Sequence, residues 1–318
     1  MTVTTRILAT EVAPMGDIEG LHHVGHVVHD MDTATERYRR LGFTVSPPAY
    51  PVLPGEGPCG VANAHVYFPR DFVELVAVID PDRTPAGARP LPLRVPDGKL
   101  PGLAAVIRAT TDNIASFLRR FQGLHIAIVD TPDIDAVAAR LTAAGVPHGG
   151  VHAVQRPVET AAGTVMEPAR YLEISAPGLP PGRVPEGRVG FAENAPVEDP
   201  RGTDHPNGAT GLVGCVLCVA DREVPEVRER YGAYLGEPRE GRANVTLVAA
   251  SALGDLLPGE RPAALPAFAA YTVAVRDITA TERLLRDHDV PTARTGAGEV
   301  FVPSAAALGA AIVFRQEP

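Results

Sequence analysis

Cysteine is rare in this chain, and long apolar runs are missing from it. Three cysteines in 318 residues fit a reducing compartment better than a disulfide-stabilised secreted protein. No run of about 18 apolar residues occurs, so we expect no membrane span. The net charge of −9 argues against a nucleic-acid partner, because binding a phosphate backbone needs clustered lysine and arginine. The opening MTVTTRILATEVAP lacks a basic segment followed by an apolar core, so we expect no secretion signal and a cytoplasmic location.

Two of the cysteines, Cys215 and Cys218, have the spacing of a CxxC motif. They lie within the run VGCVLCVA, which is typical of a buried strand. Side chains three residues apart on a strand point to opposite faces of the sheet. This spacing favours two separately buried small residues over a redox or metal motif.

A strand–helix unit with a capping aspartate occurs four times. In the first copy, the apolar segment Leu21–Val28 is followed by Asp30, an amphipathic helix and Gly42, where the helix ends. The four copies cover residues 21–45, 124–146, 212–236 and 268–290. An internal repeat of this kind is stronger evidence for the fold than any single motif.

Each early copy continues into further strands. The first is followed by predicted strands at Val61–Phe68 and Phe72–Ile79, which gives the order βαβββ. A short helix at Asp112–Phe121 precedes the second copy. After that copy we expect three strands, at Gly150–Arg156, Gly163–Glu167 and Arg170–Ser175.

The composition then changes to proline, glycine and charge between Pro177 and Gly208, as expected of a linker. The length favours two domains, and four units taken in pairs give the same number. We therefore predict an N-terminal domain over residues 1–190 and a C-terminal domain over residues 205–318.

Two carboxylates interrupt apolar strands, and each has a histidine partner in the same module. Glu74 lies in FVELVAV and follows His23 by 51 residues, while Glu173 lies in YLEIS and follows His125 by 48. A buried ionised carboxylate is costly unless it is paired or bound to a cation. Duplicated units usually pack about a pseudo-twofold axis, which would bring both pairs to one centre. Two imidazoles and two carboxylates favour a divalent transition metal.

These motifs resemble the vicinal oxygen chelate superfamily, which includes glyoxalase I, methylmalonyl-CoA epimerase, extradiol dioxygenases and bleomycin-resistance proteins. LHHVGHVVHDMDTA is similar to the opening strand and helix of that superfamily, and FVELVAV to its closing strand. FLRRFQGLHIAIVDTPDIDAVAARLTAAGV resembles the second module of the epimerase. Asn63 and the HPNG sequence resemble the two-domain glyoxalase-like branch. The resemblance implies an α+β fold of four βαβββ modules, paired into two domains with cupped mixed sheets.

The resemblance also implies a site in the N-terminal domain. One divalent ion (Zn, Ni, Co, Mn or Fe) would be held by His23, Glu74, His125 and Glu173, with Glu173 as the catalytic base. His65, Tyr67 and Arg170 lie on neighbouring strands, where we expect contacts to a small-molecule substrate. Strand alternation places His22 and His26 on the face away from His23. Gly214, Ala270 and Val313 or Ile312 stand at the ligand positions of the C-terminal domain, so we expect no metal there.

Three functions fit this site. The first is a metal-dependent isomerase, epimerase or lyase that moves a proton next to a carbonyl through a metal-bound enediolate. The second is an Fe(II)-dependent dioxygenase, which the fourth protein ligand disfavours. The third is a metal-free protein that binds a small molecule or confers resistance to it. We expect no membrane or nucleic-acid partner and take a homodimer as the assembly to test.

Overall fold

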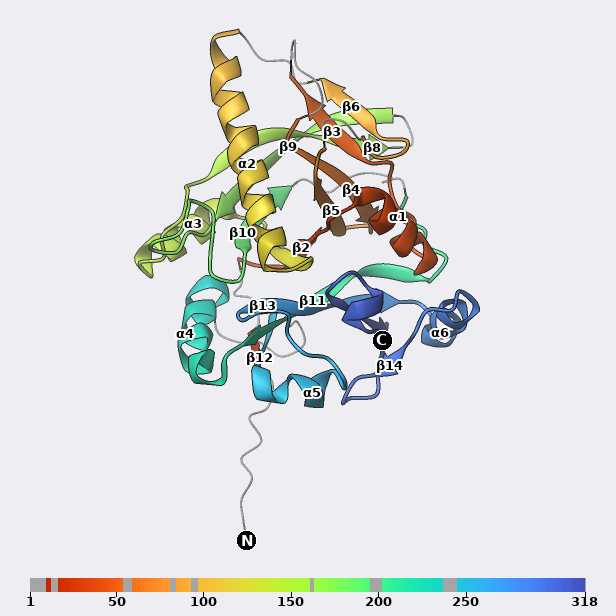
Figure 1. Cartoon of the computed structure of the whole chain (residues 1–318). Helices are drawn as coiled ribbons and strands as arrows, with labels where there is room; N and C mark the ends of the chain where they lie inside the picture. Colours follow the sequence, from red (N-terminus) through yellow and green to blue (C-terminus); the bar gives the residue numbers. More distant parts are fainter. Residues whose placement is uncertain are drawn as a thin grey trace.

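The computed structural model describes residues 10–12, 17–53, 59–80, 84–92, 97–160, 163–194, 202–236 and 245–317. Two curved sheet regions with helices on their outer sides make up the molecule, and they join in one continuous sheet where Phe268 pairs with Leu124. The N-terminal half lies above the C-terminal half in Figure 1. Both halves contain the repeated strand–helix units, so the α+β fold of paired modules is confirmed.

The first module follows the predicted order. Its elements are β2 (Gly20–Val27), α1 (Met31–Arg40), β3 (Ala49–Val52), β4 (Val61–Tyr67) and β5 (Phe72–Val78). Asp30 caps α1 by accepting a hydrogen bond of 2.7 Å from the Thr33 backbone N–H. Gly42 follows the helix with φ +83°, a conformation that favours glycine. The last strand, β5, returns parallel to β2.

The second module differs from the prediction in its later strands. It consists of β7 (Gly123–Asp130), α3 (Ile134–Ala143), β8 (His152–Thr160), β9 (Gly163–Glu173) and β10 (Arg188–Asn194). The two strands expected at Gly163–Glu167 and Arg170–Ser175 are one strand, β9. The strand that closes the module parallel to β7 is β10, which lies inside the predicted linker. The N-terminal sheet therefore continues to Asn194, past the predicted end of the domain at 190.

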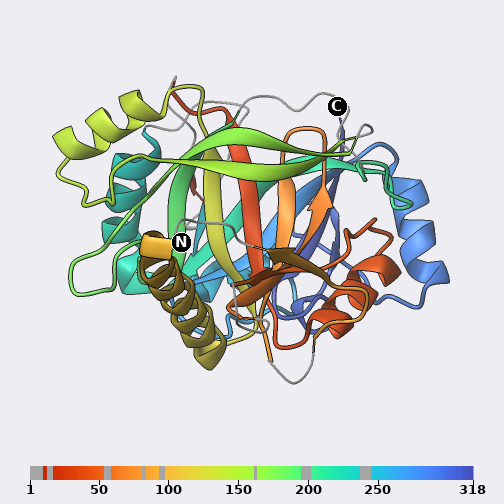
Figure 2. The same ribbon diagram turned by 90° about the horizontal axis from the view of Figure 1, so that it is seen from above.

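The two modules share one sheet. Its strand order is β8-β9-β10-β7-β2-β5-β4-β3, with β6 (Arg89–Pro92) added beside β3. The first strands of the two modules, β2 and β7, run antiparallel at the centre. Figure 2 looks onto this sheet from above and shows these two strands side by side. This arrangement is the pseudo-twofold pairing expected of duplicated modules.

A helix between the two modules closes one end of the concave face. The helix α2 (Leu100–Arg120) follows the short turn η1 (Asp97–Lys99) and has Pro101 in its first turn. It is longer than the helix predicted from Asp112. Its buried Ile114 and Phe117 pack against Val27 and Ile126 of the central strands. None of the helices in the described part of the chain is long and apolar enough to cross a membrane.

The C-terminal half has a second sheet region of the same kind. Its strands are β11 (Ala209–Val219), β12 (Val245–Ala249), β13 (Ala267–Val275), β14 (Ala293–Arg294), β15 (Val300–Val302) and β16 (Ala311–Gln316). Its helices are α4 (Val224–Leu235), α5 (Leu253–Leu256) and α6 (Ile278–Asp287), with η2 (Asp221–Glu223), η3 (Ala250–Ala252) and η4 (Ser304–Ala306) as short turns. The strand β1 (Thr10–Val12) pairs with β12. Residues expected in the N-terminal domain thus extend the C-terminal sheet.

Apolar side chains cover the face of the C-terminal sheet that corresponds to the concave face above. Val216, Ala270 and Val313 form a buried cluster there with Leu253 and Leu257 from α5 and its end. Cys215 and Cys218 belong to the clusters on opposite faces of β11, as their spacing predicted. The absence of metal from this half stays a prediction.

The two halves are joined by buried polar contacts. The hydroxyls of Tyr38 and Tyr271 are 2.8 Å apart, and Tyr38 also bonds His26 Nδ1 at 2.8 Å. Asn207 donates a hydrogen bond of 3.0 Å to Leu41 O, and His205 bonds Tyr67 O at 2.9 Å. His205 and Asn207 do lie in a turn, as expected, and this turn also fixes the N-terminal half against the C-terminal half.

Candidate functional site

The concave face of the N-terminal sheet, here called the cup, carries a row of polar side chains on four of its strands. Asn63 and His65 lie on β4, Glu74 on β5, Glu173 on β9 and Arg188 on β10. Strand pairing sets them side by side, because residues opposite one another in a sheet share a face. His65 of β4 pairs with Glu74 of β5, and Glu74 pairs with Gly25 of β2. On the other side of β2, Gly25 pairs with Ile126 of β7, and Ile126 pairs with Arg188 of β10.

Glu74 is the more buried of the two acids in this row. Its side chain is only 16% exposed, and the Asn63 amide donates a short hydrogen bond to Oε1. The nearest imidazole atom, His65 Nε2, is 4.0 Å from the same oxygen. Burial raises the pKa of Glu74 above its usual value, although the nearby Arg188 and the Asn63 hydrogen bond oppose this shift. The result is a carboxyl group that accepts a proton more readily than an ordinary glutamate.

Arg188 lies between the two carboxylates of the row. Its Nε is 3.1 Å from Glu173 Oε1, and its charge also acts on Glu74. The side chains of Arg188 and Glu173 are 20% and 29% exposed. Glu173 therefore has a cationic partner, whereas Glu74 has a neutral amide as its closest contact.

Aromatic rings line the neighbouring end of the cup. His23 is stacked on Phe72 with ring centroids 4.6 Å apart, and His65 is stacked on Tyr67 at 5.0 Å. His22 lies beside His23, with their Nδ1 atoms 2.7 Å apart, and its Nε2 contacts the Asn194 amide. His65 and Tyr67 thus face the cup, and their contact with substrate stays a prediction.

The position of His22 differs from the predicted one. Simple alternation put it on the face away from His23, but β2 shifts register between Leu21 and His23. Such a bulge places an extra residue in one strand and breaks the alternation. Both imidazoles consequently lie at the same end of the cup. His26 follows alternation and points to the opposite face, as predicted.

His125 occupies a second bulge, in β7. The pairing of β7 with β2 passes from Ile126 to Leu124 and leaves His125 as the extra residue. The His125 ring is fully buried, stacks on Phe117 at 4.9 Å and bonds Phe121 O through Nε2 at 2.9 Å. Burial, the largest cause, lowers its pKa to about 4. These contacts hold the ring against the end of α2.

The module alignment explains why His125 is not the partner of His23. Matching β7 to β2 by their ends and by the caps Asp133 and Asp30 pairs His125 with His22 and Ile126 with His23. Matching β10 to β5 pairs Gly190 with Glu74. A Cβ at Gly190 would lie 2.4 Å from Leu172 O, so this position has no room for a carboxylate.

Glu173 is likewise shifted by one strand. It lies on β9 opposite Gly190, which is the relationship that His65 of β4 has to Glu74. The sequence YLEIS looks like a closing strand, but the closing strand is β10. The predicted equivalence of Glu74 and Glu173 is therefore wrong.

The four predicted ligands do not form a metal centre in this arrangement. Within the described part of the chain, no three His, Cys, Asp or Glu side chains are placed to hold one ion. His125 Nε2 is bonded to a carbonyl oxygen and Glu173 is paired with Arg188. A cation beside Glu74 would also face the positive charge of Arg188. In this arrangement the donors do not fit the predicted four-ligand site.

Arg170 is not part of the cup. It lies on β9 between Ala169 and Tyr171 and points toward α3, where it pairs with Asp135 at 2.7 Å and Glu193 at 3.3 Å. The prediction that Arg170 contacts substrate is therefore not supported by its position.

Arg188 is the main cup residue that the sequence prediction missed. It stands in a stretch rich in proline, glycine and charge, which resembles a linker. The short alternating segment RVGFAEN was the available signal for a strand. Asn194 was missed for the same reason.

Comparisons with known proteins agree with this fold. The profile of the glyoxalase-like domain family matches residues 21–235. None of the curated proteins matches the sequence. A hypothetical protein from Staphylococcus aureus is 11% identical, with 94% of this chain and 99% of that chain covered and a TM-score of 0.55. A mutant of 4-hydroxymandelate synthase from Streptomyces coelicolor is 14% identical, with 94% and 92% covered and a TM-score of 0.53.

Methylmalonyl-CoA epimerase from Mycobacterium tuberculosis is 20% identical over 60% of this chain and 95% of that chain. Its TM-score of 0.29 is too low for any inference. The two structures with higher scores support the two-domain fold alone, because their identity is low. The family profile covers most of the chain and includes every residue of the cup described above. This chain therefore belongs to the glyoxalase-like domain family.

Proposed function

We propose that the cup catalyses proton transfer at a carbon next to a carbonyl group of a small molecule, with Glu74 as the acid–base residue. The observation that carries this proposal is the buried Glu74 carboxyl group, whose pKa is raised, beside a cationic guanidinium. A general base works best when its pKa lies near the working pH, and burial is the usual way to raise that of a carboxylate.

Glu74 has the contacts that this role needs. The Asn63 amide fixes the orientation of one carboxyl oxygen, while the 16% exposure of the side chain leaves it accessible from the cup. His65, at 4.0 Å, is close enough to exchange a proton through one water molecule.

Arg188 supplies positive charge where an enolate oxygen would develop. A fixed cation in a partly buried site stabilises such an oxyanion more strongly than the same charge in water. Its ion pair with Glu173, through Nε, holds the guanidinium in place. We therefore assign Glu173 a positioning role and Glu74 the role of base.

A divalent ion, when bound, would supply Lewis-acid stabilisation of the same enolate. The predicted ligands do not fit a common ion in this structure, so the steps above use the residues of the chain alone. Neither the enediolate on a metal nor the dioxygenase reaction gains support from the arrangement of the side chains.

Binding without turnover is the second candidate function. The stacked pairs His23–Phe72 and His65–Tyr67 present aromatic surface next to Glu74, which suits a small planar ligand. The two functions differ in one observable: a catalyst exchanges the proton next to the carbonyl, whereas a binding protein only retains the ligand.

The test uses a panel of 2-oxo acids, α-hydroxy ketones and acyl thioesters in D₂O under anaerobic conditions. We expect catalysed deuterium incorporation into at least one compound, followed by NMR. Glu74→Gln should slow it by about a hundredfold or more, and Glu173→Gln by a smaller factor. Saturable binding without exchange would support the binding function. A larger effect of Glu173→Gln would make that residue the base, as the resemblance first implied. Incorporation of oxygen from O₂ would support the dioxygenase function.

A further inference from the structure

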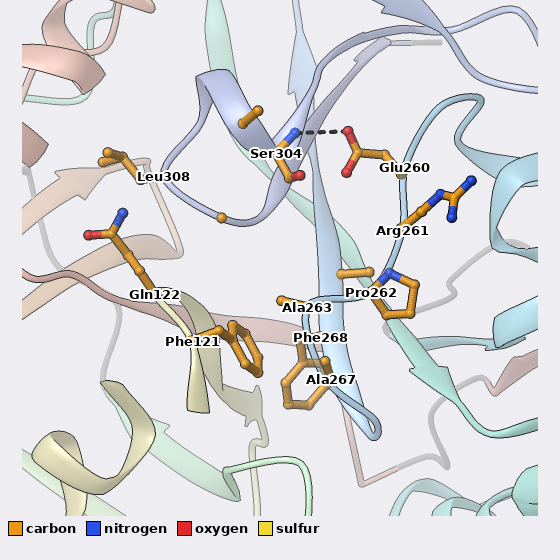
Figure 3. A pocket seen from close by; sticks show the side chains of 13 residues that line it. Phe121, Gln122, Glu260, Arg261, Pro262, Ala263, Ala267, Phe268, Ser304 and Leu308 are labelled. Atoms are coloured by element: carbon orange, nitrogen blue, oxygen red, sulfur yellow. Dashed lines mark hydrogen bonds between the residues drawn. The ribbon is translucent and has the colours of Figure 1, made fainter. Parts of the chain in front are cut away.

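A separate cavity of about 330 Å³ lies outside the cup, where the end of α2 meets the C-terminal half (Figure 3). Phe121 and Gln122 contribute one wall from the N-terminal half. The loops around Glu260, Ala263 and Ser304 contribute the others. A volume of this size is in the lower part of the range of small-molecule sites.

The walls of this cavity are fixed by contacts between the two halves. Gly309 has φ +98°, and a Cβ there would lie 1.8 Å from Gln122 O, so the two backbones are in direct contact. Arg120 donates a short hydrogen bond to Pro266 O across the same boundary. The Gln122 side chain is held because its Oε1 accepts a hydrogen bond of 2.9 Å from His29 N. The cavity is therefore built by packing of the two halves and not by a single loose loop.

The polar groups of the cavity differ in how many of their hydrogen-bonding atoms already have a partner in the protein. Glu260 Oε1 accepts a hydrogen bond of 2.9 Å from Ser304 N, which orients the carboxylate. Within the described part of the chain, Glu260 Oε2 has no hydrogen-bond or ion-pair partner. Figure 3 shows the Glu260 carboxylate beside Ser304, whereas the Arg261 guanidinium points away from both. The charge next to this wall is therefore negative.

The opposite side of the cavity is apolar and aromatic. Figure 3 shows the rings of Phe121 and Phe268 close to each other, with Ala263 and Ala267 nearby. Phe268 and Ala267 are buried in the core, so Phe121 and Ala263 provide the accessible part of this apolar wall. The Phe121 ring already has the Arg120 guanidinium 5.4 Å from its centroid, so this wall contributes apolar contact and the carboxylate contributes the charge. An apolar wall opposite a carboxylate suits a cation with an apolar body. A carboxylate ligand would be repelled by Glu260.

We propose that this cavity binds a small organic ammonium ion that carries a short apolar or aromatic group. The ammonium group would donate hydrogen bonds to Glu260 Oε2 and Ser304 Oγ, and the apolar group would lie against Phe121 and Ala263. This site is distinct from the cup and from the proton transfer proposed there. It nevertheless adjoins the cup through Phe121, whose ring centroid is 4.2 Å from that of His125.

The experiment is a titration of the full-length protein with three probes of similar shape, followed by calorimetry and protein NMR. We expect phenethylamine to bind saturably at about millimolar concentration or below. Neutral 2-phenylethanol and anionic 3-phenylpropionate should bind at least about tenfold more weakly. Failure of phenethylamine to saturate, or equal binding of the three probes, would overturn the proposal.

Two variants locate the binding. Glu260→Gln keeps an acceptor for Ser304 N but removes the charge, so it should weaken phenethylamine binding by about tenfold. Ala263→Phe fills the cavity from an exposed position, so it should abolish binding without unfolding the protein. Arg261→Ala is the matched control, and it should change the affinity less than about twofold. Loss of phenethylamine binding in Arg261→Ala but not in Glu260→Gln would show that Glu260 does not bind the ammonium group and would overturn the proposal.

Discussion

His22 and His125 occupy equivalent bulges in the two central strands of the N-terminal sheet. Both modules thus have a bulge at the same position of their first strand, but the two imidazoles have different surroundings. His22 contacts His23 and Asn194 at one end of the cup, whereas His125 is enclosed by aromatic rings at the end of α2. The symmetry of the fold therefore does not produce symmetry of the site.

The contacts of His125 lead to a prediction about metal. We expect protein purified without added metal to contain less than about 0.1 equivalents of divalent ion, because the donors do not converge. Elemental analysis of the wild type, with His23→Ala as the comparison, checks this. Stoichiometric metal in the wild type that is lost in His23→Ala and in Glu74→Gln would show that the side chains rearrange around an ion. The four-ligand hypothesis would then be restored.

Two buried histidines make stability depend on pH. Burial lowers the pKa of both His26 and His125 from 6.5 to about 4 in the folded protein. Between these values the unfolded chain binds protons that the folded protein does not, so stability falls as pH decreases. The contribution of each neutral histidine to the free energy of unfolding is fully present above about pH 6.5. It is lost as the pH falls toward 4, by about 3 kcal/mol per histidine.

Urea unfolding at pH 7.5, 6.0 and 5.0 measures this effect. His26→Leu should flatten the dependence by roughly one proton, while replacement of the exposed His29 by Gln should leave it unchanged. A free energy of unfolding that is constant between pH 7.5 and 5.0 would contradict the assigned burial.

The Tyr38–Tyr271 contact should behave as a coupled pair. Tyr38→Phe leaves the Tyr271 hydroxyl and His26 Nδ1 without their partner, so it should cost about 1–3 kcal/mol. Tyr271→Phe removes one bond and should cost less. The double variant should be less destabilised than the sum of the two, because the same bond is lost in both. Tyr50→Phe, at a partly buried tyrosine, is the control for loss of a hydroxyl. Additive effects would show that the two hydroxyls do not interact.

Gly190 should tolerate no side chain. A Cβ there would meet Leu172 O at 2.4 Å, in the middle of the β9–β10 pair, so Gly190→Ala should destabilise the protein by about 2 kcal/mol or more. Gly232 in α4 has nothing within 4 Å of the same atom. Gly232→Ala should therefore stabilise the protein by about 0.5–1 kcal/mol. Thermal unfolding of the two variants distinguishes them, and equal melting temperatures would refute the assigned strand pairing.

Several features of this protein followed from short stretches of sequence. The caps Asp30, Asp133 and Asp277 accept hydrogen bonds from the first turns of their helices, as predicted. Glycines at positions 42 and 145 have positive φ where the helices end. Such signals are local, because a cap or a helix end depends on a few neighbouring residues. The third copy differs, because Asp221 accepts a hydrogen bond from Ser251 N and does not cap a helix. Together with the apolar pattern, the local signals were enough to indicate the modules and their pairing.

The composition of the cup depended on contacts between distant residues. Arg188 approaches Glu74 because β10 pairs with β7, β7 with β2, and β2 with β5. Simple alternation would place His22 on the face away from the cup, but a bulge brings its imidazole beside His23. The bulge at His125 places the His125 ring against Phe117. The closing strand of the second module is β10 and not the end of β9, so Glu173 lies one strand away from the position equivalent to Glu74. Strand register and bulges are set by packing of the whole sheet, so no short sequence pattern could specify which carboxylate is buried or which cation lies near it.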